Sequence, residues 1–332
     1  MKKDRFLYFI VIALLLVASY FYFSRTNSTL RKELRDFAIE DTSKITKIFM
    51  VDKSESRVLL KKVNNKWMVN GKYFARKDAV ETLLKTMKRL DVKAPVSRSS
   101  QDNMVKNLAT FSTKVEIYTG DDKPEKTYYV GGPTQDHHGT FMIMENSSAP
   151  FIMHIPGFSG YLSTRYFTKE NLWRDPIIFR HKFSDIKSVE VEIPNNPKKS
   201  FVAQNNGGNK FSLFSENVKT QNFDTVKLKM YMGRFKRVGY ESIASEMNLQ
   251  KRDSILNSNP FSIISVEDSK NEITKVETYL RPGDGRLDED GNEYKYDIDR
   301  LYAKLENDTN LMVIQFVTFD PLFKELNYFF KK

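Results

Sequence analysis

The fold is decided by two stretches, ITKIFMV at residues 45–51 and IKSVEVEI at residues 186–193, which share one pattern. In both, apolar and polar residues alternate, as is typical of a half-buried β-strand. Each is followed by a further alternating stretch and a related turn, NNKW at 64–67 and GNKF at 208–211. The two turns predict the same hairpin. The chain therefore repeats itself, and the repeat predicts two units built alike.

A helix is expected next in each copy. In the first, Asp78 and Glu81 fit a capping box, and apolar residues recur at helical spacing up to Leu90. In the second, Asp224 is the expected cap. A short polar helix and a return to strands then complete each copy. The short helices are expected near 102–109 and 245–256, and the strands at 114–118, 127–130, 140–145, 151–155, 261–266, 275–281, 301–306 and 311–316.

These patterns predict an α+β protein, because helices accompany antiparallel sheet in both copies. We expect one N-terminal transmembrane helix followed by two tandem duplicated α+β units, with one long helix each. The expected segments are a cytoplasmic start at 1–5, a transmembrane signal anchor at 6–23, a juxtamembrane linker at 24–44, a first repeat at 45–155, an aromatic-rich bridge at 156–185, a second repeat at 186–320 and a C-terminal tail at 321–332.

The membrane segment is the uncharged run Phe6–Phe23, FLYFIVIALLLVASYFYF. At 1.5 Å per residue it spans roughly 27 Å, close to the hydrocarbon thickness of a bilayer. A cleaved signal peptide is the alternative, with a small-residue site at 17–19. The aromatic residues that follow favour an uncleaved anchor, and the basic start favours a cytoplasmic N-terminus. We therefore expect a single-pass protein of a bacterial inner membrane, with its bulk in the periplasm.

Composition excludes several classes of site. The chain has no cysteine, which excludes disulfides, cysteine-ligated metals and cysteine nucleophiles. Its 53 Lys and Arg against 42 Asp and Glu give a net charge of +11, spread along the chain without a basic block. We therefore expect no nucleic-acid partner, although anionic lipids or acidic envelope polymers could be attracted.

The loop at residues 131–140 is the sharpest local feature, because it carries Asp136, His137 and His138 between glycines. One hypothesis is a metal site. Adjacent histidines diverge, however, and rarely hold one ion from a strand, so a hairpin loop is favoured. The aromatic residues of the bridge offer a further surface for a ligand or partner; they include Tyr161, Tyr166 and Trp173.

An acidic stretch at residues 283–293 resembles a calcium loop in composition, through Asp288, Asp290 and Asn292. Its glycine falls at position four rather than six, and no glutamate follows at position twelve, so an acidic hairpin tip is favoured. Ser159 lacks the nucleophile-elbow pattern of a serine hydrolase. We nominate no catalytic residue and expect no cofactor.

The chain resembles a bacterial family, the domain-of-unknown-function family numbered 4340. The resemblance rests on the single span, the Lys-Trp hairpin, the helix 78–90, the hairpin YYVGG at 128–132 and NLWRD at 171–175. It covers roughly residues 30–320. Members look like envelope proteins, often encoded near ABC-type transport components linked to gliding motility. The resemblance implies an accessory role beside a membrane complex.

Three functional hypotheses follow. The leading one is a non-enzymatic interaction protein that belongs to a membrane complex. The second is an envelope protein that binds an anionic glycan or lipid. The third is a metal-dependent hydrolase that uses His137 and His138. The first depends on the anchor and the repeat, the second on charge and aromatics, and the third on one loop.

Overall fold

The computed structural model describes residues 13, 14, 16, 17, 19, 36–306 and 308–330. The expected span Phe6–Phe23 lies outside the described residues except for those five positions, which are helical. Within the part of the chain that is described, no helix is long and apolar enough to cross a membrane. The chain divides into two compact units, Met1–Asp175 and Pro176–Lys332.

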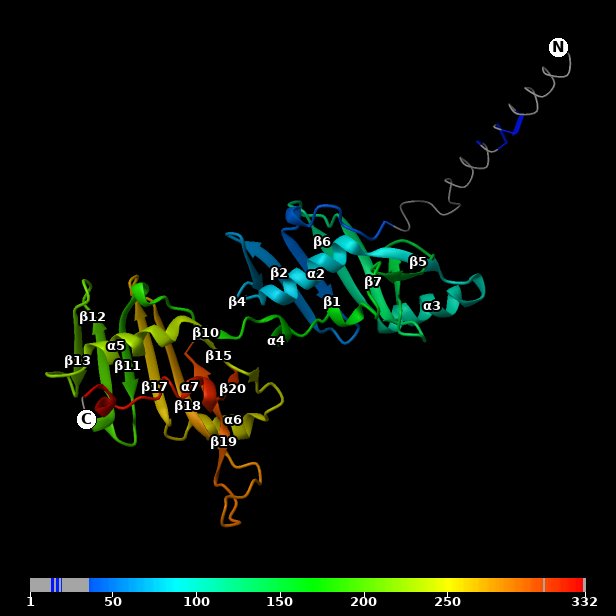
Figure 1. Cartoon of the computed structure of the whole chain (residues 1–332). Helices are drawn as coiled ribbons and strands as arrows, with labels where there is room; N and C mark the ends of the chain where they lie inside the picture. The colour runs from blue at the N-terminus through cyan, green and yellow to red at the C-terminus, as the bar shows by residue number, and fades with distance from the viewer. Residues whose placement is uncertain (1–12, 15, 18, 20–35, 307, 331–332) are drawn as a thin grey trace. The chain divides into compact units, whose positions relative to one another are not determined.

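Unit 1 is built on a nine-stranded antiparallel sheet with the strand order β4-β3-β2-β1-β6-β7-β8-β9-β5. Figure 1 shows α2 lying across this sheet. The strands are β1 (Lys47–Val51), β2 (Arg57–Val63), β3 (Lys66–Val69), β4 (Tyr73–Phe74), β5 (Asp91–Pro95), β6 (Thr113–Tyr118), β7 (Lys126–Pro133), β8 (Thr140–Met144) and β9 (Phe151–His154). The helices are η2 (Thr42–Lys44), α2 (Lys77–Arg89), α3 (Arg98–Phe111), η3 (Ser163–Arg165) and α4 (Glu170–Trp173).

Unit 2 carries a second nine-stranded antiparallel sheet, β14-β13-β12-β11-β17-β18-β19-β20-β16, and a small sheet of two strands. The main strands are β11 (Ile186–Glu192), β12 (Phe201–Asn205), β13 (Phe211–Ser215), β14 (Val218–Thr220), β16 (Ser242–Ile243), β17 (Ser262–Asp268), β18 (Ile273–Pro282), β19 (Tyr296–Leu305) and β20 (Leu311–Gln315). The small sheet pairs β10 (Ile177–Phe179) with β15 (Val238–Gly239). The helices are η4 (Phe183–Asp185), η5 (Pro197–Lys199), α5 (Thr225–Met232), η6 (Gly233–Lys236), α6 (Leu249–Leu256), α7 (Phe316–Phe319) and η7 (Leu326–Phe329).

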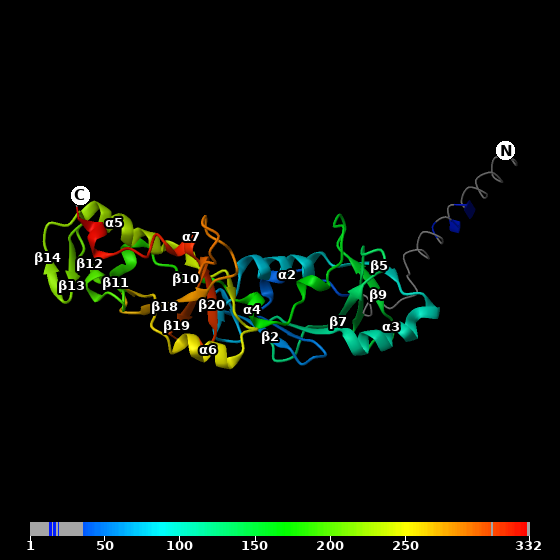
Figure 2. The same cartoon turned by 90° about the horizontal axis from the view of Figure 1, so that it is seen from below.

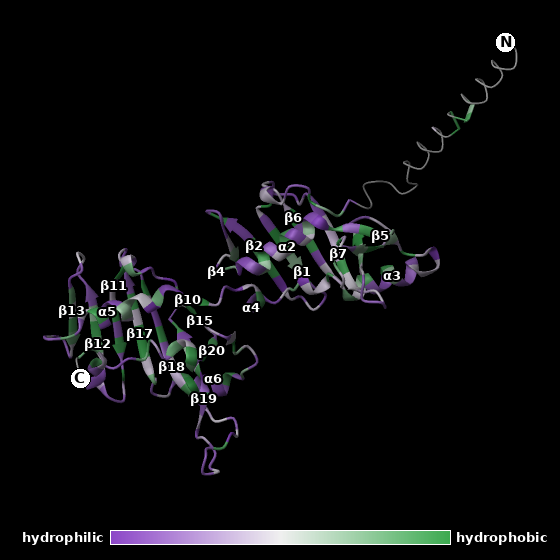
Figure 3. Ribbon diagram, in the orientation of Figure 1, coloured by the Kyte–Doolittle hydropathy of each residue, from purple (hydrophilic) through white to green (hydrophobic). Residues whose placement is uncertain are grey.

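The two large sheets have the same strand order when β11 is matched to β1 and the following elements in turn. At the far edge, beside the last strand, lie β5, which follows α2 in unit 1, and β16, the first strand of the large sheet after α5 in unit 2. The protein is a mixed α+β protein with large antiparallel sheets and few helices. Figure 3 shows apolar residues concentrated on strands, while turns are mostly hydrophilic.

Each sheet buries one face in its own core. In β1, Ile48 and Met50 are fully buried, whereas the alternate residues Lys47, Phe49 and Val51 point to the other face and are partly exposed. Helix α2 packs Val80, Leu83 and Met87 into this core, and α5 packs Leu228, Tyr231 and Met232 into that of unit 2.

A second helix covers part of the outer face in each unit. Figure 2 shows α2 and α3 on opposite sides of the sheet of unit 1, and α5 and α6 on opposite sides in unit 2. Helix α3 contacts β7 and β8, and a Cβ at Gly131 would overlap Leu108 of that helix. The glycine therefore allows the helix to lie close to the strand. Apart from Ser212, the outer side chains of β1–β3 and of β11–β13 stay partly or fully exposed.

Several sequence predictions need correction. The predicted capping box is wrong, because Arg76 is the N-cap of α2 and Asp78 lies in the first turn, ion-paired with Arg76. The Arg76 amide donates to the Trp173 carbonyl at 2.7 Å, which keeps this residue extended and starts the helix after it. The prediction of Asp224 as a cap is confirmed, because its carboxylate accepts from the amides of residues 226 and 227.

The prediction of one long helix in each unit is also wrong. Unit 1 has two, of 13 and 14 residues, whereas α5 has only eight. At Gly233 the helix ends and continues as the 3-10 turn η6, since glycine is a poor helix former.

The segments expected as a linker, a bridge and a tail also differ from what the structure shows, because they contribute residues to the two cores. Phe37, expected in the linker, is buried in the core of unit 1, and Phe329, expected in the tail, is buried in that of unit 2. The bridge divides, because Trp173 belongs to the first core and Phe179 to the second.

Candidate functional site

The β7–β8 loop is a tight turn stabilised by its own polar groups. The Thr134 amide donates to the Gly139 carbonyl at 2.9 Å, and the His137 amide donates to the Thr134 carbonyl at 2.9 Å. His137 has a φ of 56°, in the left-handed region. The Asp136 carboxylate accepts from the Thr134 hydroxyl and from the His138 amide, the latter at 3.0 Å. The loop geometry therefore rests on Asp136.

Asp136 stays ionised over a wide pH range. The hydrogen bond from Thr134, followed by that from the His138 amide, lowers the pKa of its carboxyl to about 2. Lys93 of β5 adds an ion pair, with Nζ 3.6 Å from Asp136 Oδ2. This aspartate is thus a structural anion of the loop.

The two histidine rings point to different neighbours. The His137 ring lies 5.7 Å from the Tyr161 ring, and His138 Nδ1 lies 3.2 Å from the Ser159 hydroxyl oxygen. The structure therefore gathers Asp136, His137, His138 and Tyr161 at one end of unit 1. Across the described residues, no group of three or more histidine, aspartate or glutamate side chains is placed to hold a metal ion.

The contact between Ser159 and His138 does not form a catalytic triad. In a triad, a carboxylate orients the ring of the histidine. Asp136 accepts instead from the backbone amide of His138, and all three residues are exposed. The arrangement offers hydrogen-bonding groups to a surface ligand.

Tyr166 and Trp173, two bridge residues predicted to bind a partner, lie in the core of unit 1. Trp173 is fully buried, stacks on Phe167 at 4.1 Å and donates from Nε1 to its carbonyl at 2.8 Å. The Tyr166 hydroxyl lies 3.3 Å from that of Tyr128, and burial raises the pKa of Tyr166 to about 12. Their side chains stabilise the fold and are not available at the surface.

The acidic stretch around Asp288 forms the tip of a long connection between β18 and β19. Asp288 accepts from the Asp290 amide at 3.0 Å and from the Asn292 amide at 2.8 Å. Its Oδ1 is therefore used to close the turn. This fits the hairpin-tip interpretation of Asp288, Asp290 and Asn292.

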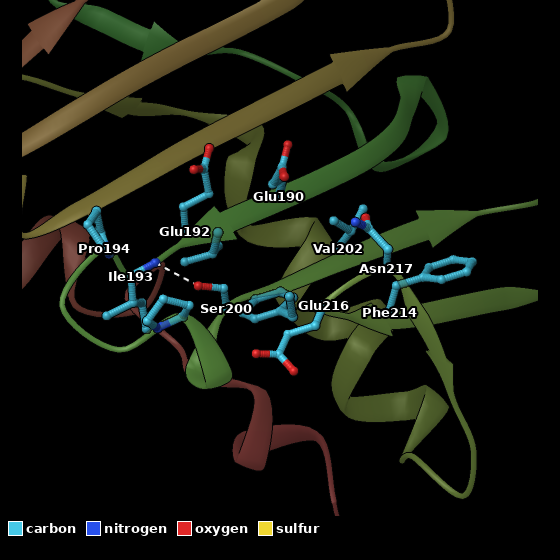
Figure 4. Close-up of a pocket in the computed structure, with 12 residues that line it drawn as sticks. Glu190, Glu192, Ile193, Pro194, Ser200, Val202, Phe214, Glu216 and Asn217 are labelled. Carbon is cyan, nitrogen blue, oxygen red and sulfur yellow. Dashed lines mark hydrogen bonds between the residues drawn. The ribbon is translucent and has the colours of Figure 1, made fainter.

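A shallow hollow of about 250 Å³ lies on the outer face of unit 2. Figure 4 shows Glu190 and Glu192 on the same side of β11, with Glu216 across the hollow. Apolar side chains, including Val202 and Phe214, line the rest. Burial, followed by the charge of Glu192, raises the pKa of Glu190. The hollow thus presents acidic and apolar groups, which attract cations more than anions.

This hollow was not predicted from the sequence. The sequence pattern that could have indicated it is the alternation in residues 186–193, which places Glu190 and Glu192 on the same outward face of the strand. Lys93 and Ser159 were not predicted as neighbours of the β7–β8 loop either, because only the folded sheet brings β5 and the segment after β9 beside it.

The model of a family described as a domain of unknown function (DUF4340) matches residues 67–254, more than half of the chain. The matched stretch runs from β3 of unit 1 into α6 of unit 2. No curated protein and no solved structure matches the chain.

Proposed function

Because the chain belongs to the DUF4340 family of domains of unknown function, we propose its role from its fold and surface. We propose a membrane-anchored, extracytoplasmic interaction protein that acts by binding rather than by catalysis. It would be an accessory component of an envelope complex in a bacterial inner membrane, such as an ABC-type transport or gliding-associated system. The shared strand order supports a tandem duplication of one α+β unit.

The observation that carries the proposal is the connection between β18 and β19, residues 283–295, here called the arm. Figure 1 shows the arm in orange, projecting away from the sheet of unit 2. Leu287 on the arm is 58% exposed, and Tyr296 and Ile298 at its base are 40% and 45% exposed. Exposed apolar residues on a projecting hairpin are typical of a protein-binding element.

The base of the arm is held by a charged network. Arg286 donates to Asp299 at 2.6 Å, to Asp284 at 2.9 Å and to Asp297 at 3.3 Å. Asp297 is almost fully buried, and it also accepts from the backbone amides of Asp299 and Arg300. Because the arm is ordered before binding, a partner would lose little affinity to ordering it.

The test uses the absence of cysteine, which makes any introduced thiol unique. Leu287→Cys in the full-length chain, labelled with a benzophenone maleimide and irradiated in native membranes, should cross-link to a small set of membrane subunits. Val226→Cys on the exposed side of α5, also in unit 2 and 65% exposed, is the matched control. Cross-linking of the same proteins from both positions, or of none, would contradict a partner at the arm.

The orientation in the membrane is tested separately. A membrane-impermeant maleimide should label Leu287→Cys in cells with a permeabilised outer membrane. It should label Asp4→Cys only after the inner membrane is lysed. The reverse pattern would place the bulk of the chain in the cytoplasm.

A further inference from the structure

The outer face of β1–β3 in unit 1, here called the basic face, carries cations without carboxylate partners. Lys47, Arg57, Lys61 and Lys66 point to this face from three neighbouring strands. Among the ion pairs between described residues, none involves any of these four. Arg57, Lys61 and Lys66 are exposed, so they form a free positive surface.

The strand register places two of these lysines together. Lys47 lies directly opposite Lys61, a cross-strand pair of like charge that weakens a sheet. Lys47 Nζ lies 3.6 Å from the centroid of the Tyr118 ring, which partly offsets the repulsion. Glu116, the acid on the neighbouring strand, is held by Lys114 at 2.9 Å. Glu116 also attracts Lys47, whereas no ion pair between described residues neutralises Arg57, Lys61 or Lys66.

Apolar side chains lie between the cations. Val63 and Phe74 are 45% and 39% exposed. Phe49, Leu59 and Met68 are partly exposed beside them. Cationic groups interleaved with apolar side chains match the interface of an anionic bilayer, where lysine stems lie along apolar surface and ammonium groups meet headgroups. A soluble acidic polymer would use the charges but not Val63 and Phe74.

The chain enters unit 1 on the core side of the sheet, at the end of the strands that carries Lys47 and Lys61. Lys126 Nζ is 2.9 Å from an Asp36 carboxylate oxygen, which fixes the first residue of the described body beside the start of β7. Lys126 pairs with Ile117, and Ile117 pairs with Ile48, next to Lys47. The entry point and the Lys47–Lys61 pair therefore lie at the same end of the strands. The acidic turn at 121–122 between β6 and β7 bounds the basic face on that side.

The segment between the expected membrane span and unit 1, here called the tether, is short enough to keep the basic face near the bilayer. Twelve residues lie between Phe23, the end of the apolar run, and Asp36. Fully extended, they reach at most about 45 Å. A face held within that distance of a bilayer meets its surface at a high effective concentration.

We propose that the basic face docks on the anionic lipid surface of the membrane that tethers the chain. The inference rests on the proposed membrane anchor. It does not extend to unit 2, because Glu190 and Glu192 stand on β11 where β1 has Phe49 and Val51.

The test places the full-length chain in nanodiscs with and without phosphatidylglycerol. Val63→Cys carries an environment-sensitive fluorophore on the basic face, and Gln204→Cys carries it at the outer position of β12 that matches Lys61. The Val63 label should shift to the blue only with the anionic lipid, and salt should reverse the shift. The Gln204 label should not respond.

Charge removal sharpens the test. The triple change Arg57→Gln, Lys61→Gln and Lys66→Gln should lower the docking equilibrium about 100-fold, because each basic residue near an anionic surface contributes about a factor of five. A matched triple change on α2, which lies on the opposite side of the sheet, should leave the shift unchanged; it consists of changes at three exposed residues, Lys77→Gln, Lys85→Gln and Lys88→Gln.

Equal effects of the two triple changes, or a silent Val63 label in anionic nanodiscs, would overturn the inference. An alkaline wash, which removes proteins that are not anchored in the bilayer, distinguishes failure of docking from failure of the anchor. A chain that stays in the membrane while its Val63 label is silent contradicts only the docking. A chain that the wash removes contradicts the proposed function as well.

Discussion

The β7–β8 hairpin of unit 1 and the β18–β19 hairpin of unit 2 hold the same place in the strand order, but differ in length. The first closes over residues 134–139 and the second over the arm, residues 283–295. An aspartate organises each, Asp136 in the loop and Asp297 at the base of the arm. The repeated core therefore tolerates divergence at this hairpin, where a change of length leaves the sheet intact.

The outer faces of the two large sheets have also diverged, while their core positions stay alike. Positions that point into the core stay apolar in both units, as with Ile48 and Val189. The neighbouring outward positions are Phe49 in unit 1 and Glu190 in unit 2. The two units share how they fold but not what they present, so each is expected to contact a different chemical environment.

The largest expected effect tests whether the two cores are separate. Trp173→Ala removes a fully buried side chain from unit 1 and should destabilise that unit by about 3–5 kcal/mol. Both tryptophans, Trp67 and Trp173, are in unit 1, so the remaining Trp67 fluorescence reports its unfolding alone. Denaturant titration followed by this fluorescence should show the loss.

The matched change is Phe201→Ala in unit 2, where the ring is buried 4.8 Å from that of Phe329. It should cost a similar amount but leave the Trp67-reported transition in place. A transition that moves equally with both changes would mean that the two cores unfold as one, and the comparison between separate units would fail.

The next effect concerns the arm. Arg286→Gln removes the donors that join Asp284, Asp297 and Asp299, while Arg281, 3.6 Å from Asp297, remains. Amides of the arm should exchange with deuterium faster, with the exchange of unit 1 unchanged. Lys295→Gln, an exposed charge removal on the same arm, is the control. Unchanged exchange in Arg286→Gln would show that the tip, not the network, orders the arm.

Long periodic elements were predictable from the sequence. The helix predicted at 78–90 is Lys77–Arg89, and the strand predicted at 114–118 is Thr113–Tyr118. The edge strands β4, β14 and β16 were missed, because two or three residues hold no period that a pattern can detect. The strand β5 was missed too, since its proline argues against a strand although an edge position accepts it.

The candidate site was predictable only in part. The residues of the β7–β8 loop stand together in the sequence, so Asp136, His137 and His138 could be singled out. Their partners Lys93 and Ser159 lie more than twenty residues away in opposite directions and meet them through strand pairing. Exposure, which separates Tyr161 from the buried Tyr166, follows from tertiary packing and has no local signal.

A smaller effect is the acid resistance of the β7–β8 loop. Asp136 has a pKa lowered to about 2, so it favours the folded loop above the ordinary aspartate value of about 3.9. That contribution should be complete above about pH 4, decrease steadily as the pH falls below that value, and be gone below about pH 2. The chemical shift of the His138 amide, which donates to this carboxylate, should titrate with a midpoint of about 2. A midpoint near 4 would mean that Thr134 and the amide do not hold the carboxylate in solution.

The smallest expected effect is in the hollow of unit 2. Burial and the charge of Glu192 raise the pKa of Glu190, so its ionised form opposes folding at neutral pH. Glu190→Gln should therefore raise the free energy of unfolding at pH 7, by at most about 0.5 kcal/mol because the side chain is largely solvated. The gain should vanish as the pH falls to about 4, where the unfolded chain is protonated as well.

Glu216→Gln removes the same charge from the exposed rim of the same hollow and is the matched control. Thermal unfolding of the two variants at pH 7 and pH 4, against the unaltered chain, measures the difference. An equal gain in both would assign the effect to the net charge of unit 2. A gain confined to Glu190→Gln would mean that unit 2 keeps an acid on this face at a cost in stability, just as unit 1 keeps the opposed Lys47 and Lys61. The two faces would then differ because each is retained for contact, not because the fold requires either charge.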